Sequence, residues 1–114
     1  GGGDWETRTE KARLTSDPQR GKVHNAWCDI DPALRCGDVT FGWLHAAQKS
    51  CMAVQAANFA SGLRVPCLFG IPAYEDLVDN QKTRALASKM KSAQCLELPG
   101  AGHEILMEKE SSQY

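Results

Sequence analysis

The fold is decided by a short apolar run, RVPCLFG, at residues 64–70. It is bounded by proline and glycine and is typical of a buried β-strand. Pro66 belongs near the start of that strand, where its missing N–H does least harm to the hydrogen-bond ladder. A helix is expected to follow over residues 79–91, with Asp79 as its N-cap.

A second apolar stretch, QCLEL at residues 94–98, predicts another strand, and EILMEKE at residues 104–110 resembles the start of a final helix. The order strand, helix, strand, helix implies an α/β fold with parallel strands joined by a right-handed crossover. Two strands cannot make a stable sheet of their own. We therefore expect the missing strands to come from a preceding part of the same protein or from another chain.

The first half of the chain has helical rather than strand character. Residues 1–15 are polar and are expected to form a loop, and Ser-Asp-Pro at residues 16–18 is a helix-start signal. A stronger helix is predicted from Thr40 onward, with Gly62 as its stop. One face of this helix carries four residues at steps of four, four and three: Trp43, Ala47, Cys51 and Val54.

Composition excludes several classes of function. The 114 residues carry 13 Lys and Arg against 14 Asp and Glu, a net charge of -1. That balance offers no basic face for nucleic acid and no polybasic membrane anchor. No apolar stretch approaches the roughly 20 residues of a transmembrane helix, and no signal peptide is visible.

The cysteines favour a reduced, cytoplasmic protein. There are five, an odd number, and none is in a CxxC pair. His24, Cys28 and Cys36 are conceivable metal ligands, but nothing supplies a fourth ligand at zinc-like spacing. We therefore expect neither a metal nor a cofactor.

Candidate catalytic groups follow the two predicted strands. In parallel α/β sheets, functional side chains collect on loops at the carboxyl ends of strands. Glu75 and Asp76 follow the first strand and His103 follows the second. A carboxylate followed by a histidine, in that chain order, is the second half of the serine, acid, histidine order of α/β-hydrolases. Gly100 and Gly102 permit a tight turn ahead of the histidine.

Four segments together carry a family resemblance: LTSDPQR, GDVTFGWLHAA, VPCLFGIPAYEDLVDNQ and LPGAGHEILMEKE. In this order and spacing they resemble the C-terminal half of lysophospholipase and monoacylglycerol-lipase-like enzymes, a branch of the serine aminopeptidase S33-type α/β-hydrolases. The resemblance covers residues 13–110. It implies the last two parallel strands and helices of the fold over residues 64–114, and part of the helical lid over residues 1–63.

The resemblance also implies an activity, namely cleavage of fatty-acyl esters of glycerol or glycerophospholipids through an acyl-enzyme. By position, His103 is then the general base and either Glu75 or Asp76 is the acid. Counting back from the LVDN motif favours Glu75, whereas aspartate is the commoner residue type. Phe41 and Trp43 are candidates for the wall of an acyl-chain channel, although aromatic residues at helical spacing are more often core.

The nucleophile of such an enzyme is missing from the chain. No serine has the GxSxG pattern, and Ser61, in FASGLR, has no glycine two places before it. The chain alone is therefore expected to be inactive. The expected partners are a lipid or ester substrate, a membrane surface in transient contact and the missing N-terminal half of the hydrolase, with no nucleic acid. The alternative is a non-catalytic binding or regulatory remnant of the fold.

Overall fold

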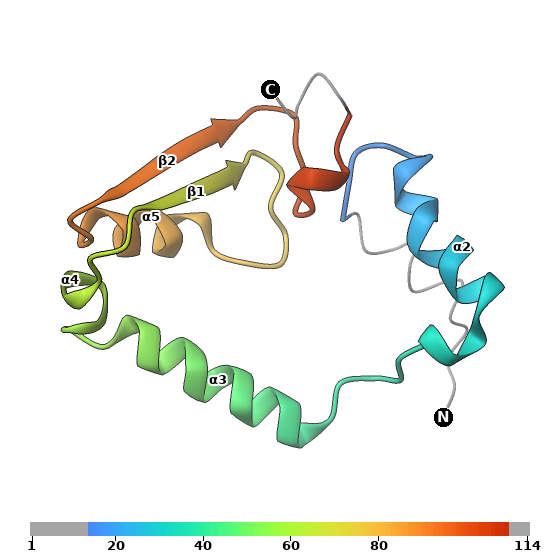
Figure 1. Cartoon of the computed structure of the whole chain (residues 1–114), viewed down its shortest axis with the longest axis horizontal. Helices are drawn as coiled ribbons and strands as arrows, with labels where there is room; N and C mark the ends of the chain where they lie inside the picture. The colour runs from blue at the N-terminus through green and yellow to red at the C-terminus, as the bar shows by residue number, and fades with distance from the viewer. Residues whose placement is uncertain (1–13, 110–114) are drawn as a thin grey trace. The chain divides into compact units, whose positions relative to one another are not determined.

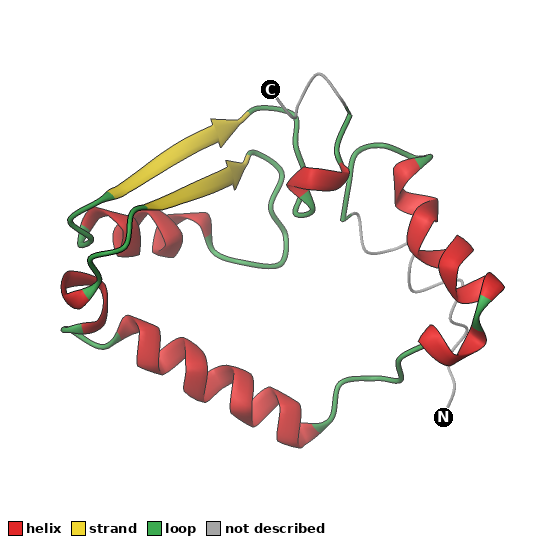
Figure 2. Ribbon diagram, viewed as in Figure 1, coloured by secondary structure: helices red, strands yellow, loops and turns green. Residues whose placement is uncertain are grey.

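A computed structural model describes residues 14–109. Strands β1 (Cys67–Pro72) and β2 (Ala93–Leu98) pair in a sheet, and helix α5 (Asn80–Ser88) connects them (Figures 1 and 2). The Cys67 N–H donates to the Ser92 carbonyl and the Ala73 N–H to the Leu98 carbonyl. The offset between partners is the same at both ends, so the strands are parallel. The predicted strand, helix, strand order is confirmed.

Helix α5 begins where the sequence predicts. The Asp79 carboxylate accepts the N–H groups of Gln81 and Lys82 at 2.9 and 3.2 Å. These bonds satisfy two amides that have no partner within the helix, which is the usual role of an N-cap aspartate. Ala87 is buried and Leu86 is half-buried, so the last turn of the helix packs inward, and Met90, two residues beyond the helix, is buried as well.

The helix-start signal at residues 16–18 is also confirmed. The Asp17 carboxylate accepts the N–H groups of Gln19 and Arg20, and the chain enters the 3-10 turn η1 (Arg20–Lys22). Helix α2 (Val23–Ile30) continues from it, and a second 3-10 turn, η2 (Pro32–Leu34), follows. Most of the loop predicted for residues 1–15, namely residues 1–13, lies outside the described residues.

The long helical pattern forms helix α3 (Phe41–Gln55), and the short helix α4 (Phe59–Gly62) ends at the predicted stop. The Thr40 hydroxyl caps α3 by accepting the N–H of Trp43 at 3.1 Å. Ala56, at ψ 144°, separates the two helices. Within the described part of the chain, no residue of α3 is buried. On its predicted apolar face, Trp43 and Cys51 are exposed, and Ala47 and Val54 are half-buried.

The described residues group into two compact units. One contains residues 14–36, 70–78 and 97–109, and its most buried residues include Cys28, Ile71 and Ala101. The other contains residues 37–69 and 79–96. Because both units are discontinuous, they do not test the boundary predicted between residues 63 and 64, and it stays a prediction.

The helix predicted over residues 104–110 is wrong for the described residues. The chain makes only the 3-10 turn η3 (Ile105–Met107) and is extended at Glu108, with φ -78° and ψ 170°. The reason is chemical: the Glu108 side chain is buried and accepts hydrogen bonds from the N–H groups of Gly102 and Ser16. Extended backbone at this residue brings the carboxylate to those donors, and the helix stops.

No helix within residues 14–109 combines the length and apolar character needed to cross a lipid bilayer.

Candidate active site

The acidic loop begins directly after β1. Glu75 is three residues beyond the strand, and its Oε1 accepts the N–H groups of Leu77 and Val78 at 2.7 and 3.1 Å. Its side chain is only 3% exposed. Two backbone donors therefore hold this carboxylate in one orientation, as an acid that must orient a partner requires.

The histidine loop follows β2 and turns at Gly100, whose φ is +80°. That region of backbone conformation is accessible to glycine at little cost and strains other residues. Ala101 and Gly102 are buried behind the turn, and His103 is half-buried, with 34% of its side chain exposed. The Tyr74 N–H donates to the Ala101 carbonyl at 3.0 Å, which joins the two loops.

The two loops bring Glu75 and His103 into direct contact. His103 Nδ1 lies 2.8 Å from one Glu75 carboxylate oxygen and 3.0 Å from the other. An ionised carboxylate can only accept hydrogen bonds, so Nδ1 carries the proton. Nε2 of the neutral ring is then left unprotonated, which is the form that can accept a proton from another group.

Burial raises the pKa of Glu75, but hydrogen bonds to the carboxylate outweigh it. The donors are the Leu77 N–H, the His103 imidazole and the Val78 N–H, and a positive charge on His103 acts in the same direction. The net pKa lies below the ordinary value of 4.5. Glu75 is therefore ionised at neutral pH, where it can hold the imidazole and stabilise the imidazolium.

The neighbouring Asp76 is exposed, and the carboxylate on the His103 ring belongs to Glu75. The sequence left two candidate acids, Glu75 and Asp76. The structure brings His103 together with Glu75, the one favoured by the count from the LVDN motif.

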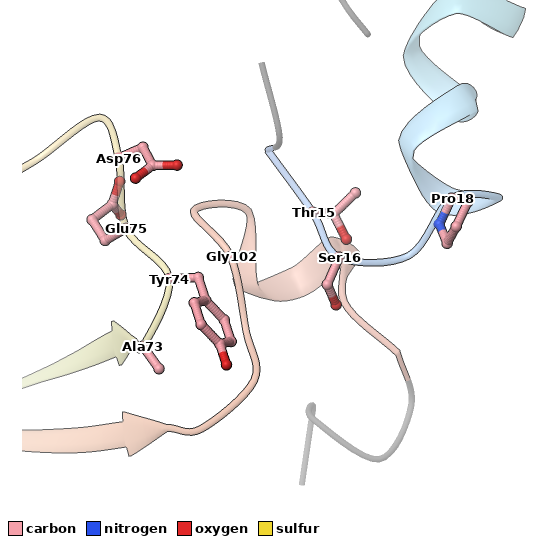
Figure 3. A pocket seen from close by; sticks show the side chains of 8 residues that line it. All are labelled: Thr15, Ser16, Pro18, Ala73, Tyr74, Glu75, Asp76 and Gly102. Atoms are coloured by element: carbon pink, nitrogen blue, oxygen red, sulfur yellow. The ribbon is translucent and has the colours of Figure 1, made fainter. Parts of the chain in front are cut away.

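A pocket of about 690 Å³ opens beside the acidic loop. Figure 3 shows Glu75, Asp76 and Tyr74 on one side of it and the segment at residues 15–18 on the other. The lining residues are Thr15, Ser16, Pro18, Ala73, Tyr74, Glu75, Asp76 and Gly102. Glu75 therefore lines this pocket, whereas His103 is not among its lining residues.

A second buried carboxylate, Glu108, was missed by reasoning from the sequence. Its Oε1 accepts the N–H groups of Gly102 and Ser16, both at 2.7 Å, and its Oε2 accepts the Ser16 hydroxyl. Burial raises the pKa of Glu108, but these bonds and the Thr15 hydroxyl lower it below the ordinary value. The one available signal was an acidic residue directly after the apolar triplet Ile105–Met107.

Phe41 and Trp43 lie in the first turn of α3, in the other compact unit, with 92% and 58% of their surfaces exposed. Their role in substrate binding stays a prediction. Across residues 14–109, no three His, Cys, Asp or Glu side chains gather closely enough to hold a metal ion.

Comparison with known proteins places the chain in a family. Residues 5–110 match the model of a family described as serine aminopeptidase, S33. The chain is also 26% identical over 106 residues to a Haemophilus influenzae protein named "Probable lysophospholipase L2". That alignment covers 93% of the chain and 33% of the relative, so the chain spans about a third of the length of the curated relative it matches. On the extent of the family match, the chain belongs to the serine aminopeptidase S33 family of α/β-hydrolases.

Proposed function

We propose that this chain is the C-terminal part of a serine hydrolase and supplies the acid and the base of its catalytic triad. The observation that carries the proposal is the contact of 2.8 Å between the Glu75 carboxylate and His103 Nδ1. The nucleophilic serine would come from the part of a longer hydrolase that precedes this chain. The coverage of one third of the relative supports this, as does the lack of a GxSxG motif in the 114 residues.

In the proposed reaction each group has a distinct role. His103 donates its Nδ1–H to the Glu75 carboxylate and uses Nε2 to take the proton from the serine hydroxyl as the serine oxygen bonds to the ester carbonyl carbon. The imidazolium that forms is stabilised by the ionised Glu75. It then gives the proton to the leaving alcohol as the carbon–oxygen bond of the ester breaks. Water hydrolyses the acyl-enzyme by the same sequence and releases the fatty acid.

We propose a fatty-acyl ester, either a lysophospholipid or a monoacylglycerol, as the substrate. The printed name of the relative supports the lysophospholipid. Exposed aromatic side chains at Phe41 and Trp43 are suited to contact an acyl chain, and substrates of this kind imply transient contact with a membrane surface. We place the enzyme in the cytoplasm, in keeping with five cysteines that form no paired motif, and we propose no nucleic-acid partner.

One observation favours a second candidate, a non-catalytic binding or regulatory remnant of the fold. The chain holds the acid and the histidine but has no serine in a GxSxG motif. If no preceding segment supplies such a serine, the protein would retain the pocket beside Glu75 for binding but would not hydrolyse esters.

The test is labelling of the full-length protein that carries this chain with a serine-reactive fluorophosphonate. We expect labelling that disappears in His103→Ala and persists in His45→Ala, a matched control because His45 is exposed on α3. The labelled protein should release fatty acid from lysophosphatidylcholine or monoacylglycerol. Labelling that is absent, or equal in the His103 variant, overturns the proposal and favours the remnant. Turnover of an aminoacyl p-nitroanilide alone would overturn the choice of substrate.

A further inference from the structure

The backbone N–H groups of the residues before and after His103 are both tied to one distant segment, residues 14–16. On the C-terminal side, the Glu104 N–H donates to the Leu14 carbonyl at 2.7 Å. On the N-terminal side, the Gly102 N–H donates to Glu108 Oε1, which also accepts the Ser16 N–H. The imidazole thus stands between two backbone anchors, and one of them passes through the Glu108 carboxylate.

Glu108 is the centre of this arrangement. Its side chain is fully buried, and its two oxygens take three hydrogen bonds from Gly102 and from the N–H and hydroxyl of Ser16. A further bond from the Thr15 hydroxyl to the Met107 carbonyl, at 2.8 Å, joins the same two segments. A buried ionised carboxylate that is this well supplied with donors strongly favours one local geometry.

The space around Gly102 shows how closely the parts fit. A Cβ atom at this position would lie 3.1 Å from Glu108 Oε1 and 3.1 Å from the Leu14 carbonyl oxygen. Any larger residue would therefore push the carboxylate and the 14–16 segment away from the backbone at Gly102, the residue before His103. Glycine at position 102 lets the loop approach both.

We propose that Glu108 is a positioning residue for the hydrolase reaction, which fixes the His103 imidazole against Glu75 by holding the loop at Gly102. The inference rests on the proposed function, because it assigns the role to the triad base. Glu108 does not contact the imidazole or the substrate. Its effect is carried by the Gly102 peptide and by the 14–16 segment.

Two variants, Glu108→Met and Glu108→Gln, test whether the hydrogen bonds accepted by residue 108 matter, or only the space that its side chain fills. Methionine is of similar length but accepts no comparable bond, so the Gly102 and Ser16 amides lose their partner. Glutamine keeps one oxygen for both amides, and its NH₂ group can donate to the Ser16 hydroxyl oxygen. Glu104→Gln is the matched control, because the Glu104 side chain is exposed and lies beside His103 in the same loop.

In the full-length protein, we expect Glu108→Met to lower kcat about a hundredfold, as displacement of a catalytic group by about 1 Å does, with little change in KM. Glu108→Gln should keep most of the wild-type kcat, and Glu104→Gln all of it. The second readout is the downfield proton resonance of His103 Nδ1, which should weaken or move in Glu108→Met and return in Glu108→Gln. Ser16→Ala, a milder change to the same cluster, should move it less.

The two proposals fail separately. An Nδ1 resonance and a kcat that are unchanged in a folded Glu108→Met protein would overturn the positioning role and leave the hydrolase intact. Equal losses in the methionine and glutamine variants would also overturn it, because the hydrogen-bond acceptor would then not matter. A wild-type protein that shows the Nδ1 resonance and its dependence on Glu108, but hydrolyses no acyl ester, would overturn the proposed function instead.

Discussion

Replacing Glu75 by glutamine should nearly abolish hydrolysis without unfolding the protein. The glutamine oxygen can still accept the N–H groups of Leu77 and Val78, which the carboxylate now accepts at 2.7 and 3.1 Å. The amide NH₂ then faces His103 Nδ1, where a carboxylate oxygen lies at 2.8 Å in the native chain. A donor at this point forces Nδ1 to accept, so the proton moves to Nε2 and the ring can no longer act as the base.

The size of the effect follows from the loss of the correct tautomer. The corresponding change of acid to amide in the Ser-His-Asp triad lowers kcat by about 10⁴, which is about 5.4 kcal/mol of transition-state stabilisation. We expect a loss of that order in the full-length protein. The local fold should change little, because both backbone hydrogen bonds to residue 75 are kept.

The assay is kcat for release of fatty acid from a lysophospholipid, together with the rate of fluorophosphonate labelling. Asp76→Asn provides the comparison, because Asp76 is the rival acid and its side chain is exposed. We expect Asp76→Asn to retain the wild-type kcat. Loss of activity in Asp76→Asn with retention in Glu75→Gln would refute the assignment of the acid.

Three further predictions concern stability. First, hydrogen bonding leaves the pKa values of Glu75 and Glu108 lower in the folded state than in the unfolded state, despite the opposing effect of burial. In the full-length protein, their contribution to the free energy of unfolding is present above the ordinary value of 4.5 and is lost as the pH falls through the folded pKa values. Urea unfolding at a series of pH values should show this loss, and the loss should be smaller in the double glutamine variant. Second, in the full-length protein, Gly102→Ala should cost about 1–3 kcal/mol by thermal unfolding, because the added Cβ overpacks against two oxygens at 3.1 Å. Gly37→Ala should be nearly neutral, because a Cβ added there meets nothing within 4 Å, and equal effects of the two changes would contradict the contacts at Gly102. Third, the 114-residue chain alone should melt without a sharp transition by circular dichroism, because two strands cannot sustain a sheet; a steep cooperative melt would contradict this.

Local patterns predicted most of the secondary structure, because their causes are local. The Asp79 cap and the apolar run before Gly70 each depend on residues that are close in sequence, and both appear where expected. The helix predicted from Thr40 to Gly62 forms in two parts, α3 and α4, and its periodicity could not show that no residue of α3 is buried within the described part of the chain. An apolar helical face indicates which residues are suited to burial, but it does not show which other part of a protein covers them.

The candidate site was predicted only in part, for the same reason. His103 and the acidic loop follow strand ends, and the topology brings such ends together. The choice of Glu75 over Asp76 needed the family's spacing, because neighbouring residues in a loop do not reveal which side chain turns toward the histidine. Glu108 could not be found, because its partner Ser16 is 92 positions away. The apolar neighbours of Glu108 predicted a helix that its long-range hydrogen bonds prevent.

The contact between Glu75 and His103 depends on a local change of register between the two strands. The last regular bond of the ladder joins the Ala73 N–H to the Leu98 carbonyl. One residue further along the acidic side, the Tyr74 N–H bonds to the Ala101 carbonyl, so the histidine side has advanced by more residues over the same distance. The positive φ of Gly100 allows this extra chain to turn out of the ladder. In the regular register, Cys67 lies opposite Ala93 and Pro72 opposite Leu98, so Glu75 would lie opposite Ala101. The turn at Gly100 is therefore needed to bring His103 to the acid.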